Sequence, residues 1–383
     1  MSYIGRTPTP AALTASDITD GIISTAKIAD NAVTEPKTAW NDVPFRNIII
    51  NGDMSIAQRA TSTASITSSG YQTIDRWHLA LSSLGTWTQS QDTDVPTGQG
   101  FATSLKMDCT TADASPSSGD AMILQTRIEG QMLQYLKKGT ASAESLTVSF
   151  WVKATKTGTN IVELRDNDNS RQISNSYTIS SSDTWEQKEI TFAGDTTGAF
   201  GNDNAKSLEI EFWLGAGTNY TSGTLATSWA SATDANKAVG QVNHADSDSN
   251  NFWITGIQLE VGTVASNFEF LPVDVNLQRC FRYFENIAAN NTFIGMGGSY
   301  LADYVGLHRY YTPKRGTPSI YQVSGTDYFR IYTGTSVSFD SFTIVYASQH
   351  SCLLYAQPTM TDNLVGWFTC NNASAKIALE AEL

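Results

Sequence analysis

Residues 146–153 read Leu-Thr-Val-Ser-Phe-Trp-Val-Lys, and residues 208–214 read Leu-Glu-Ile-Glu-Phe-Trp-Leu. In both stretches every second residue is apolar, and polar residues or a tryptophan lie between them. Residues 257–261, Ile-Gln-Leu-Glu-Val, repeat the pattern. Because successive side chains of a strand point to opposite faces, this period of two predicts antiparallel sheets packed on one side. Turns rich in Gly and Asp separate such stretches, which predicts a β-sandwich of about 220 residues.

The remaining local patterns are shorter. Charged residues make up only 16% of the chain, which fits an all-β fold with many turns. The run Ile48 to Ile50 followed by Asn-Gly-Asp predicts a buried strand that enters a turn. Loosely spaced apolar residues in 121–138 predict a short helix. We expect Asp274 to cap another helix, with Leu277 and Phe281 on one face.

A repeat precedes these elements. Residues 18–37 form two tandem ten-residue units, ITDGIISTAK and IADNAVTEPK. A spacing of five is neither a helix period nor a strand period, so one chain cannot bury these positions by folding on itself. Several parallel copies around a common axis can, and the repeat therefore predicts a cyclic homo-oligomer. The apolar positions that recur five apart are Leu13, Ile18, Ile23, Ile28 and Val33.

Composition divides the chain into three predicted domains. Residues 1–45 are punctuated by prolines and read as an extended N-terminal segment with little structure as a monomer. Residues 46–272 contain the sandwich. Residues 273–383 hold ten of the fifteen tyrosines and predict a small all-β C-terminal domain.

Charge and targeting signals restrict the function. The net charge is −13, and it arises entirely from residues 1–275, because residues 276–383 contain seven basic and seven acidic residues. A basic patch is absent from the sequence, which argues against a nucleic-acid partner. No transmembrane or signal-peptide pattern is found, and the four cysteines, which lack CxxC spacing, are expected to be single buried thiols.

Six motifs occur in a fixed order after the decapeptide repeats. They are RNIIINGDMSIAQR (46–59), IDRWHL (74–79), FWVKAT (150–155), EFWLGAG (211–217), FWITGIQLEVG (252–262) and FEFLPVDVNLQRCFRYF (268–284). Over residues 1–285 the chain resembles tail fibres of tailed bacteriophages, particularly those of phages that infect marine and other environmental bacteria. The part from ITGIQLEVG to LQRCFRYF is the most specific.

The resemblance implies a homotrimeric fibre whose N-terminus attaches to phage tail, baseplate or adaptor proteins. It also implies that the sandwich is similar to the jelly-roll folds of carbohydrate-binding modules, and that the C-terminal end faces the host. The expected fold is therefore all-β: an extended trimerising segment, an antiparallel jelly-roll-like sandwich and a small C-terminal β domain. Such a protein is assembled in the host cytoplasm and resides in the virion tail.

A sugar site needs an apolar platform flanked by groups that hydrogen-bond hydroxyls. Trp213 is expected to share the outer face of its strand with Glu209 and Glu211, and Trp151 lies similarly beside Lys153. If the two strands share a sheet, one face carries both tryptophans. The alternative is that a loop or a neighbouring protomer covers this face. Trp229 lies outside any alternation and is either an exposed platform or a plug at one end of the sandwich.

The C-terminal domain offers a second candidate surface. Tyrosine supplies a large contact area with few rotatable bonds, and basic groups meet acidic groups of a surface glycan. The alternative is that these side chains pack in a small core or between protomers. The candidate residues are Tyr300, Tyr304, Arg309, Tyr310 and Tyr311, with His308, Lys314 and Arg315 nearby.

The sequence contains few signs of a catalytic or cofactor-binding motif. GxSxG, a P-loop and HExxH are absent, and the oxygen-rich runs 166–169 and 244–250 do not follow a calcium-loop pattern. We expect no enzyme activity, metal or cofactor. The expected function is non-catalytic attachment of a virion to a host surface glycan or outer-membrane receptor. The alternatives are a polysaccharide depolymerase spike, a purely structural tail adaptor or a lone carbohydrate-binding module.

Overall fold

The structure is a computed structural model that describes residues 45–300, 303–357 and 364–383. Residues Phe45–Leu383 form one compact unit. The repeat positions Leu13, Ile18, Ile23, Ile28 and Val33 lie outside the described residues, so the trimerising segment stays a prediction. The predicted domain boundary at residue 272 also stays a prediction. Within the described residues, no helix is long and apolar enough to span a membrane.

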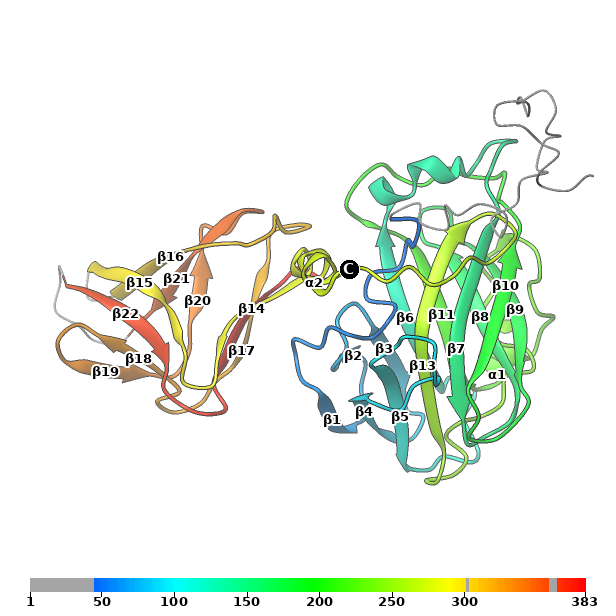
Figure 1. The fold of residues 1–383 in the computed structure, drawn as a ribbon, viewed down its shortest axis with the longest axis horizontal. Coiled ribbons are helices and arrows are strands. Elements are labelled where there is room, and N and C mark those ends of the chain that lie inside the picture. Colours follow the sequence, from blue (N-terminus) through cyan, green and yellow to red (C-terminus); the bar gives the residue numbers. More distant parts are fainter. Residues whose placement is uncertain (1–44, 301–302, 358–363) are drawn as a thin grey trace, which may run out of the picture. The chain divides into compact units, whose positions relative to one another are not determined.

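Two antiparallel sheets form the sandwich that the alternating stretches predicted (Figure 1). The first sheet has the order β1 (Ser62–Ile66), β4 (Thr86–Asp92), β5 (Ser104–Thr111), β13 (Asn251–Val261), β7 (Leu146–Ala154), β10 (Glu186–Phe192). The second has the order β12 (Ala230–Ser231), β9 (Arg171–Ile179), β8 (Gly158–Asp166), β11 (Lys206–Ala216), β6 (Ala121–Glu129), β3 (His78–Ser82), β2 (Gly70–Tyr71).

The core lies between these sheets. Val148, Phe150 and Val152 of β7 are fully buried, as are Ile210 and Phe212 of β11. The rings of Phe150 and Phe212 meet edge to face with centroids 5.0 Å apart, which joins the two sheets directly. The expected all-β sandwich is therefore confirmed, and so is the burial of the four cysteines as free thiols.

Three local expectations need correction. Residues 121–129 form strand β6, because Met122, Leu124 and Ile128 enter the core at even positions. The further apolar residues between them also fit a loose helical spacing, and the prediction of a helix here was therefore wrong. Ile48 to Ile50 are buried but form no strand. Helix α2 (Val273–Phe281) does form, although Pro272 occupies the N-cap position without a side-chain hydrogen bond, so Asp274 is not the cap.

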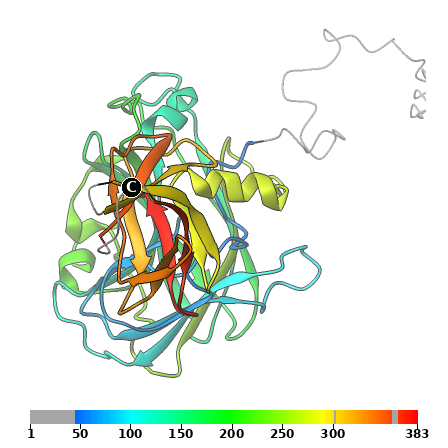
Figure 2. The ribbon, with the colours of Figure 1, turned by 90° about the vertical axis from the view of Figure 1, so that its left-hand side faces the viewer.

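Two smaller sheets form what we call the terminal module, coloured yellow to red in Figure 2. One has the order β14 (Phe284–Ala289), β23 (Lys376–Glu380), β17 (Ser319–Val323). The other has the order β19 (Ser336–Phe339), β18 (Phe329–Tyr332), β22 (Val365–Cys370), β15 (Phe293–Tyr300), β16 (Asp303–Arg309), β21 (Ser351–Ala356), β20 (Thr343–Val345). Phe329, Phe342 and Phe368 centre a separate core.

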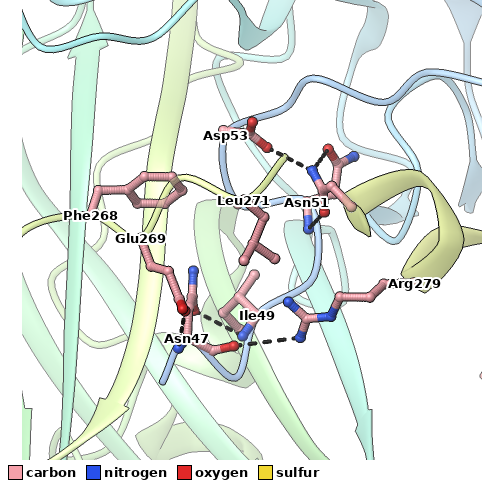
Figure 3. A pocket seen from close by; sticks show the side chains of 10 residues that line it. Asn47, Ile49, Asn51, Asp53, Phe268, Glu269, Leu271 and Arg279 are labelled. Atoms are coloured by element: carbon pink, nitrogen blue, oxygen red, sulfur yellow. Dashed lines mark hydrogen bonds between the residues drawn. The ribbon is translucent and has the colours of Figure 1, made fainter. Parts of the chain in front are cut away.

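The most specific motifs build a polar clasp beside the first sheet (Figure 3). The Asn47 carboxamide donates to the Ile257 carbonyl (3.2 Å), and its oxygen accepts the Leu259 amide (3.1 Å). The Glu269 carboxylate accepts the Asn47 amide at 2.9 Å. From α2, Asn276 donates to Asp53 at 3.1 Å. The cavity enclosed here measures about 10 Å³, room for one water, so these motif residues hold structure and do not form a ligand site.

Buried ion pairs tie the last residues of the chain to the sandwich. Arg76, only 1% exposed, forms an ion pair with Glu382, and its guanidinium lies 3.5 Å from the centroid of the Tyr283 ring. Arg59 pairs with both Glu380 (2.8 Å) and Glu382 (3.2 Å). The carboxylate of Glu382 thus contacts both buried guanidinium groups, and it is the ion-pair partner of Arg76 while Arg59 also has Glu380.

We expect the substitution Glu382→Ala to lower the free energy of unfolding by about 3–5 kcal/mol, because it leaves a buried cation without its partner. The measurement is urea unfolding followed by tryptophan fluorescence. The control Glu144→Ala removes an ion pair with Lys137 whose side chains are 34% and 54% exposed, and should cost at most about 1 kcal/mol. Equal losses in the two variants would contradict this role of Glu382.

Candidate functional site

An open pocket of about 420 Å³ lies on the outer face of the second sheet. Strands β3, β6, β8 and β11 form its floor. The segment that contains helix α1 (Thr218–Thr221) and the 3-10 turn η6 (Asp234–Asn236) forms its wall. We call it the outer pocket; its lining residues are Ala80, Ile123, Gln125, Arg127, Arg165, Lys206, Glu209, Glu211, Trp213, Tyr220, Asp234 and Lys237.

Strand β11 brings three predicted site residues into this pocket. Its even positions from Leu208 to Leu214 enter the sandwich core, so Glu209, Glu211 and Trp213 point outward together. Trp213 is nevertheless only 1% exposed, because the loop after β11 covers it and places the Tyr220 ring 5.3 Å from its own. The alternative that a loop covers this face therefore holds for the tryptophan.

Glu209 is held by three donors. Lys206 lies 2.8 Å and Arg127 3.1 Å from one carboxylate oxygen, and Asn167 donates to the other at 3.0 Å. Burial alone would raise the pKa of Glu209, but these donors hold it below the usual value. Glu209 is therefore an ionised structural anion at neutral pH.

Glu163 and Glu211 form a carboxyl pair under the pocket. They are directly opposite in the β8–β11 register, and the indole of Trp213 donates to Glu163 at 3.1 Å. Burial, reinforced by the neighbouring Glu211, raises the pKa of Glu163 well above its usual value. Burial and the charge of Glu209 raise the pKa of Glu211 as well. The pair therefore retains a proton at pH values where exposed carboxyls have lost theirs.

The pocket has an excess of positive charge. Its lining carries four basic residues and three acidic ones, in a protein of net charge −13. Lys237 pairs with Asp234 at 2.7 Å. Arg165 is different: within the described part of the chain its guanidinium has no ion pair or hydrogen bond, although it interacts electrostatically with Glu211 and Glu163.

Trp151 lies elsewhere. It belongs to β7 of the first sheet, beside Lys153 on that sheet's outer face, whereas Trp213 belongs to the second sheet. The condition that one sheet carries both tryptophans is therefore not met. Trp229 packs against the main core, is partly buried, and donates its indole hydrogen to the Ala193 carbonyl at 2.7 Å. This position is that of a plug at the sandwich edge.

The tyrosine candidates of the terminal module have different environments. Tyr304 is fully buried in the module core, and Tyr310 packs against that core. Arg309 is exposed, and Tyr311 is 77% exposed and stacked on Phe281 at 5.7 Å. Only the backbone of Tyr300 is described. The structure therefore places Tyr304 in the core, where it cannot contact a receptor, and leaves Tyr310 partly exposed at its edge.

An apolar stripe crosses the outer face of the larger terminal sheet. Trp367 pairs in register with Tyr332 on one side and Met296 on the other. On the next strands Leu307 pairs with Leu353, which in turn pairs with Val345. Exposed fractions are 60% for Met296, 58% for Leu307, 41% for Trp367 and 38% for Tyr332. An exposed apolar surface spanning several strands is typical of a binding face.

Sequence reasoning missed part of the outer pocket, namely Arg165, Lys206, Tyr220 and Lys237. The period-two stretch 158–166 carried a usable signal for Glu163 and Arg165, because both alternate with apolar residues. Lys237 and Tyr220 gave no such signal, since they come from the segment after β11 that contains α1 and η6, and not from a strand.

The oxygen-rich runs are engaged in internal contacts. Asp166 pairs with Lys138 at 2.5 Å, and Asn250 donates to Asp246 at 2.7 Å. In the portion of the chain that the structure describes, no group of three or more His, Cys, Asp or Glu residues has a metal-binding arrangement.

No protein-family model matches the chain, and no curated protein matches it. Among solved structures, the enzymatically active domain of tailspike protein 4 of bacteriophage CBA120 is 16% identical with a TM-score of 0.31, over 58% of this chain and 23% of that one. TmCBM61 in complex with β-1,4-galactotriose is 11% identical with a TM-score of 0.29, over 57% and 99%. The CBM22-1 xylan-binding domain of Paenibacillus barcinonensis Xyn10C is 14% identical with a TM-score of 0.23, over 53% and 94%. Similarity at this level carries no argument about function.

The carboxyl pair predicts a pH-dependent stability. Folded Glu163 keeps its proton above the ordinary glutamate pKa of 4.5, whereas the unfolded chain releases it, so this group lowers stability as pH rises above about 4.5. The substitution Glu163→Gln removes this dependence and can still accept the Trp213 indole hydrogen. We therefore expect the difference in melting temperature, variant minus parent, to become more positive as the pH rises from about 5 to about 8.

Differential scanning fluorimetry across this range measures the effect. The pKa of Asp75 is raised to about 6 by burial, but this group contributes equally to both proteins and cancels in the difference. Glu144→Gln, at a partly exposed carboxyl, is the matched control and should track the parent. Parallel curves for Glu163→Gln and the parent would show that Glu163 does not hold a proton in the folded state.

Proposed function

We propose that this protein binds carbohydrate of a bacterial surface without cleaving it, as a homotrimeric fibre in the tail of a virion. The observation that carries the proposal is the outer pocket, an open site of about 420 Å³ in which charged, amide and aromatic side chains converge. Its volume lies within the range of small-molecule sites. The fibre, its docking to tail proteins and its assembly in the host cytoplasm rest on the repeats and the sequence resemblance.

The chemistry of the pocket suits a sugar. Carboxylates and amides accept hydrogen bonds from hydroxyl groups, while basic side chains donate to hydroxyl and ring oxygens. Tyr220, which is only partly buried, offers an aromatic surface to the C–H face of a pyranose, and Trp213 supports it from beneath. The covered tryptophan thus acts through the tyrosine that lies over it.

One observation favours the depolymerase alternative. Glu209 and Glu211 are neighbours on one strand, and their environments shift the two pKa values in opposite directions, which is a pattern of acid–base pairs. However, Glu209 is fixed at both carboxylate oxygens by hydrogen-bond donors, namely Lys206, Arg127 and Asn167. A carboxylate engaged in this way is poorly placed to act as base or nucleophile, so we favour binding.

The terminal module suits the attachment role through its apolar stripe. The stripe carries Trp367, Met296 and Leu307 at high exposure, while the module has no net charge over residues 276–383. An uncharged aromatic and aliphatic surface suits contact with an outer-membrane receptor protein. We assign this contact to the stripe and not to the tyrosine run around residue 304.

The oligomeric state can be tested directly. Multi-angle light scattering of the full chain should give about three times the monomer mass of 41.5 kDa. The double substitution Ile23→Asp and Ile28→Asp places charges on the apolar repeat and should shift the protein toward monomers. Ser24→Asp, which adds a charge at a neighbouring polar position, is the control. A stable monomer of the parent chain would contradict the trimeric assembly.

Carbohydrate binding without cleavage is tested with a panel of neutral and acidic polysaccharides. We expect retardation of the protein in affinity electrophoresis by at least one of them, and no increase in reducing ends after prolonged incubation. Release of reducing ends that is lost in Glu211→Gln would establish the depolymerase alternative. Failure to bind any polysaccharide would leave the structural adaptor as the better account.

A further inference from the structure

The lining of the outer pocket carries more positive than negative side chains, whereas the whole protein is negatively charged. The chain carries a net charge of −13, so a negatively charged ligand is repelled from most of its surface. In the pocket, four basic side chains face three acidic ones. Lys206 and Arg127 share the single carboxylate of Glu209, and Lys237 pairs with Asp234. Arg165 is the basic residue of the pocket that has no ion pair or hydrogen bond among the described residues, although it interacts electrostatically with Glu211, Glu163 and Asp234.

Arg165 is positioned for an external anion. It points outward from β8 opposite Glu209 of β11, at the floor of the pocket, and within the described residues its five donors have no acceptor. A guanidinium presents its donors as a planar fork that matches a carboxylate with two parallel hydrogen bonds. A half-buried guanidinium whose donors make no hydrogen bond among the described residues can be completed by a ligand that supplies the acceptors.

Glu211 can complement the arginine because it retains a proton readily. The raised pKa of its carboxyl, caused by burial and by the charge of Glu209, reduces the repulsion of an approaching anion. In its protonated form the carboxyl also donates one hydrogen bond. The Gln125 amide of the neighbouring strand satisfies its contacts when its oxygen and nitrogen exchange places, and its nitrogen then lies 3.3 Å from Glu211 and its oxygen 2.7 Å from Arg127.

We propose that the outer pocket selects acidic sugars, and that Arg165 binds the carboxylate of a uronic acid residue in the glycan. This inference rests on the proposed function and names its ligand class. A sugar ring is needed as well as the charge, because Tyr220 offers an aromatic face and the Glu209 carboxylate faces the same space. An inorganic anion would engage Arg165 alone.

The test uses pairs of trisaccharides that differ only in the carboxylate. β-1,4-linked trimannuronate is compared with β-1,4-mannotriose, and trigalacturonate, triguluronate and triglucuronate are compared with their neutral counterparts, by isothermal titration calorimetry with the full chain. We expect at least one acidic member to bind more tightly than its neutral partner by about tenfold or more, as a charge-assisted hydrogen bond predicts. Added salt should weaken only the acidic ligand.

Variants of Arg165 test whether this residue causes the tighter binding of the acidic ligand. Arg165→Gln should reduce the affinity for the acidic ligand by about tenfold to a hundredfold, and should reduce that for the neutral one by much less, because only the acidic ligand loses a charge-assisted pair. Arg165→Lys keeps the charge but loses the fork, and should give an intermediate loss. Arg330→Gln removes a similar charge from the terminal module, outside the pocket, and should have no effect. Melting curves establish that each variant is folded.

The outcomes separate this inference from the proposed function. If a neutral trisaccharide binds as tightly as its acidic counterpart, or Arg165→Gln binds the acidic one normally, acid selectivity is wrong while carbohydrate binding stands. If inorganic sulfate at equal ionic strength displaces the acidic ligand but not the neutral one, the charge site is supported. If no member of the panel binds at millimolar concentration, both the inference and the proposed function are overturned.

Discussion

Two buried guanidinium groups, those of Arg59 and Arg76, depend on carboxylates near the end of the chain. Both pair with Glu382, which lies two residues after strand β23 of the terminal sheet, and Arg59 also pairs with Glu380 of that strand. Taking charges out of water is costly, so each ion is tolerated only because the others are in place. The rings of Phe284 and Tyr283 lie 3.8 Å and 3.5 Å from the two guanidinium groups and complete the junction. The sandwich therefore becomes complete only when residues some 300 positions downstream are docked.

Strand β11 contributes both to the core and to the candidate binding pocket. Its inward residues form the centre of the core, and its outward residues form the floor of the outer pocket. The same backbone register that packs Phe212 on Phe150 places Glu211 opposite Glu163. A slip by one residue would exchange the two sets, so the core and the pocket determine one register together.

Sequence patterns predicted most of the sandwich, because alternation is local and one face is buried. They failed for 121–129, where five apolar residues among nine satisfied a loose helical spacing as well as a strand. They brought Glu209, Glu211 and Trp213 together correctly, since these share one strand. They did not predict Arg165 or Tyr220 beside them, because strand order and loop closure depend on contacts far apart in sequence. The burial of Tyr304 was hidden for the same reason: its partner Phe368 is on another strand.

The buried carboxyl pair explains why an acidic protein can present an anion site at all. If Glu163, Glu209 and Glu211 were all ionised, the pocket would lose its positive character and Arg165 would be neutralised from within. Burial opposes this, because removing water favours the neutral form of a carboxyl group and raises the pKa of Glu163 and Glu211. The donors on Glu209 confine the remaining charge to one carboxylate that is already compensated. Desolvation of Glu163 thus leaves the guanidinium of Arg165 available to a ligand from outside.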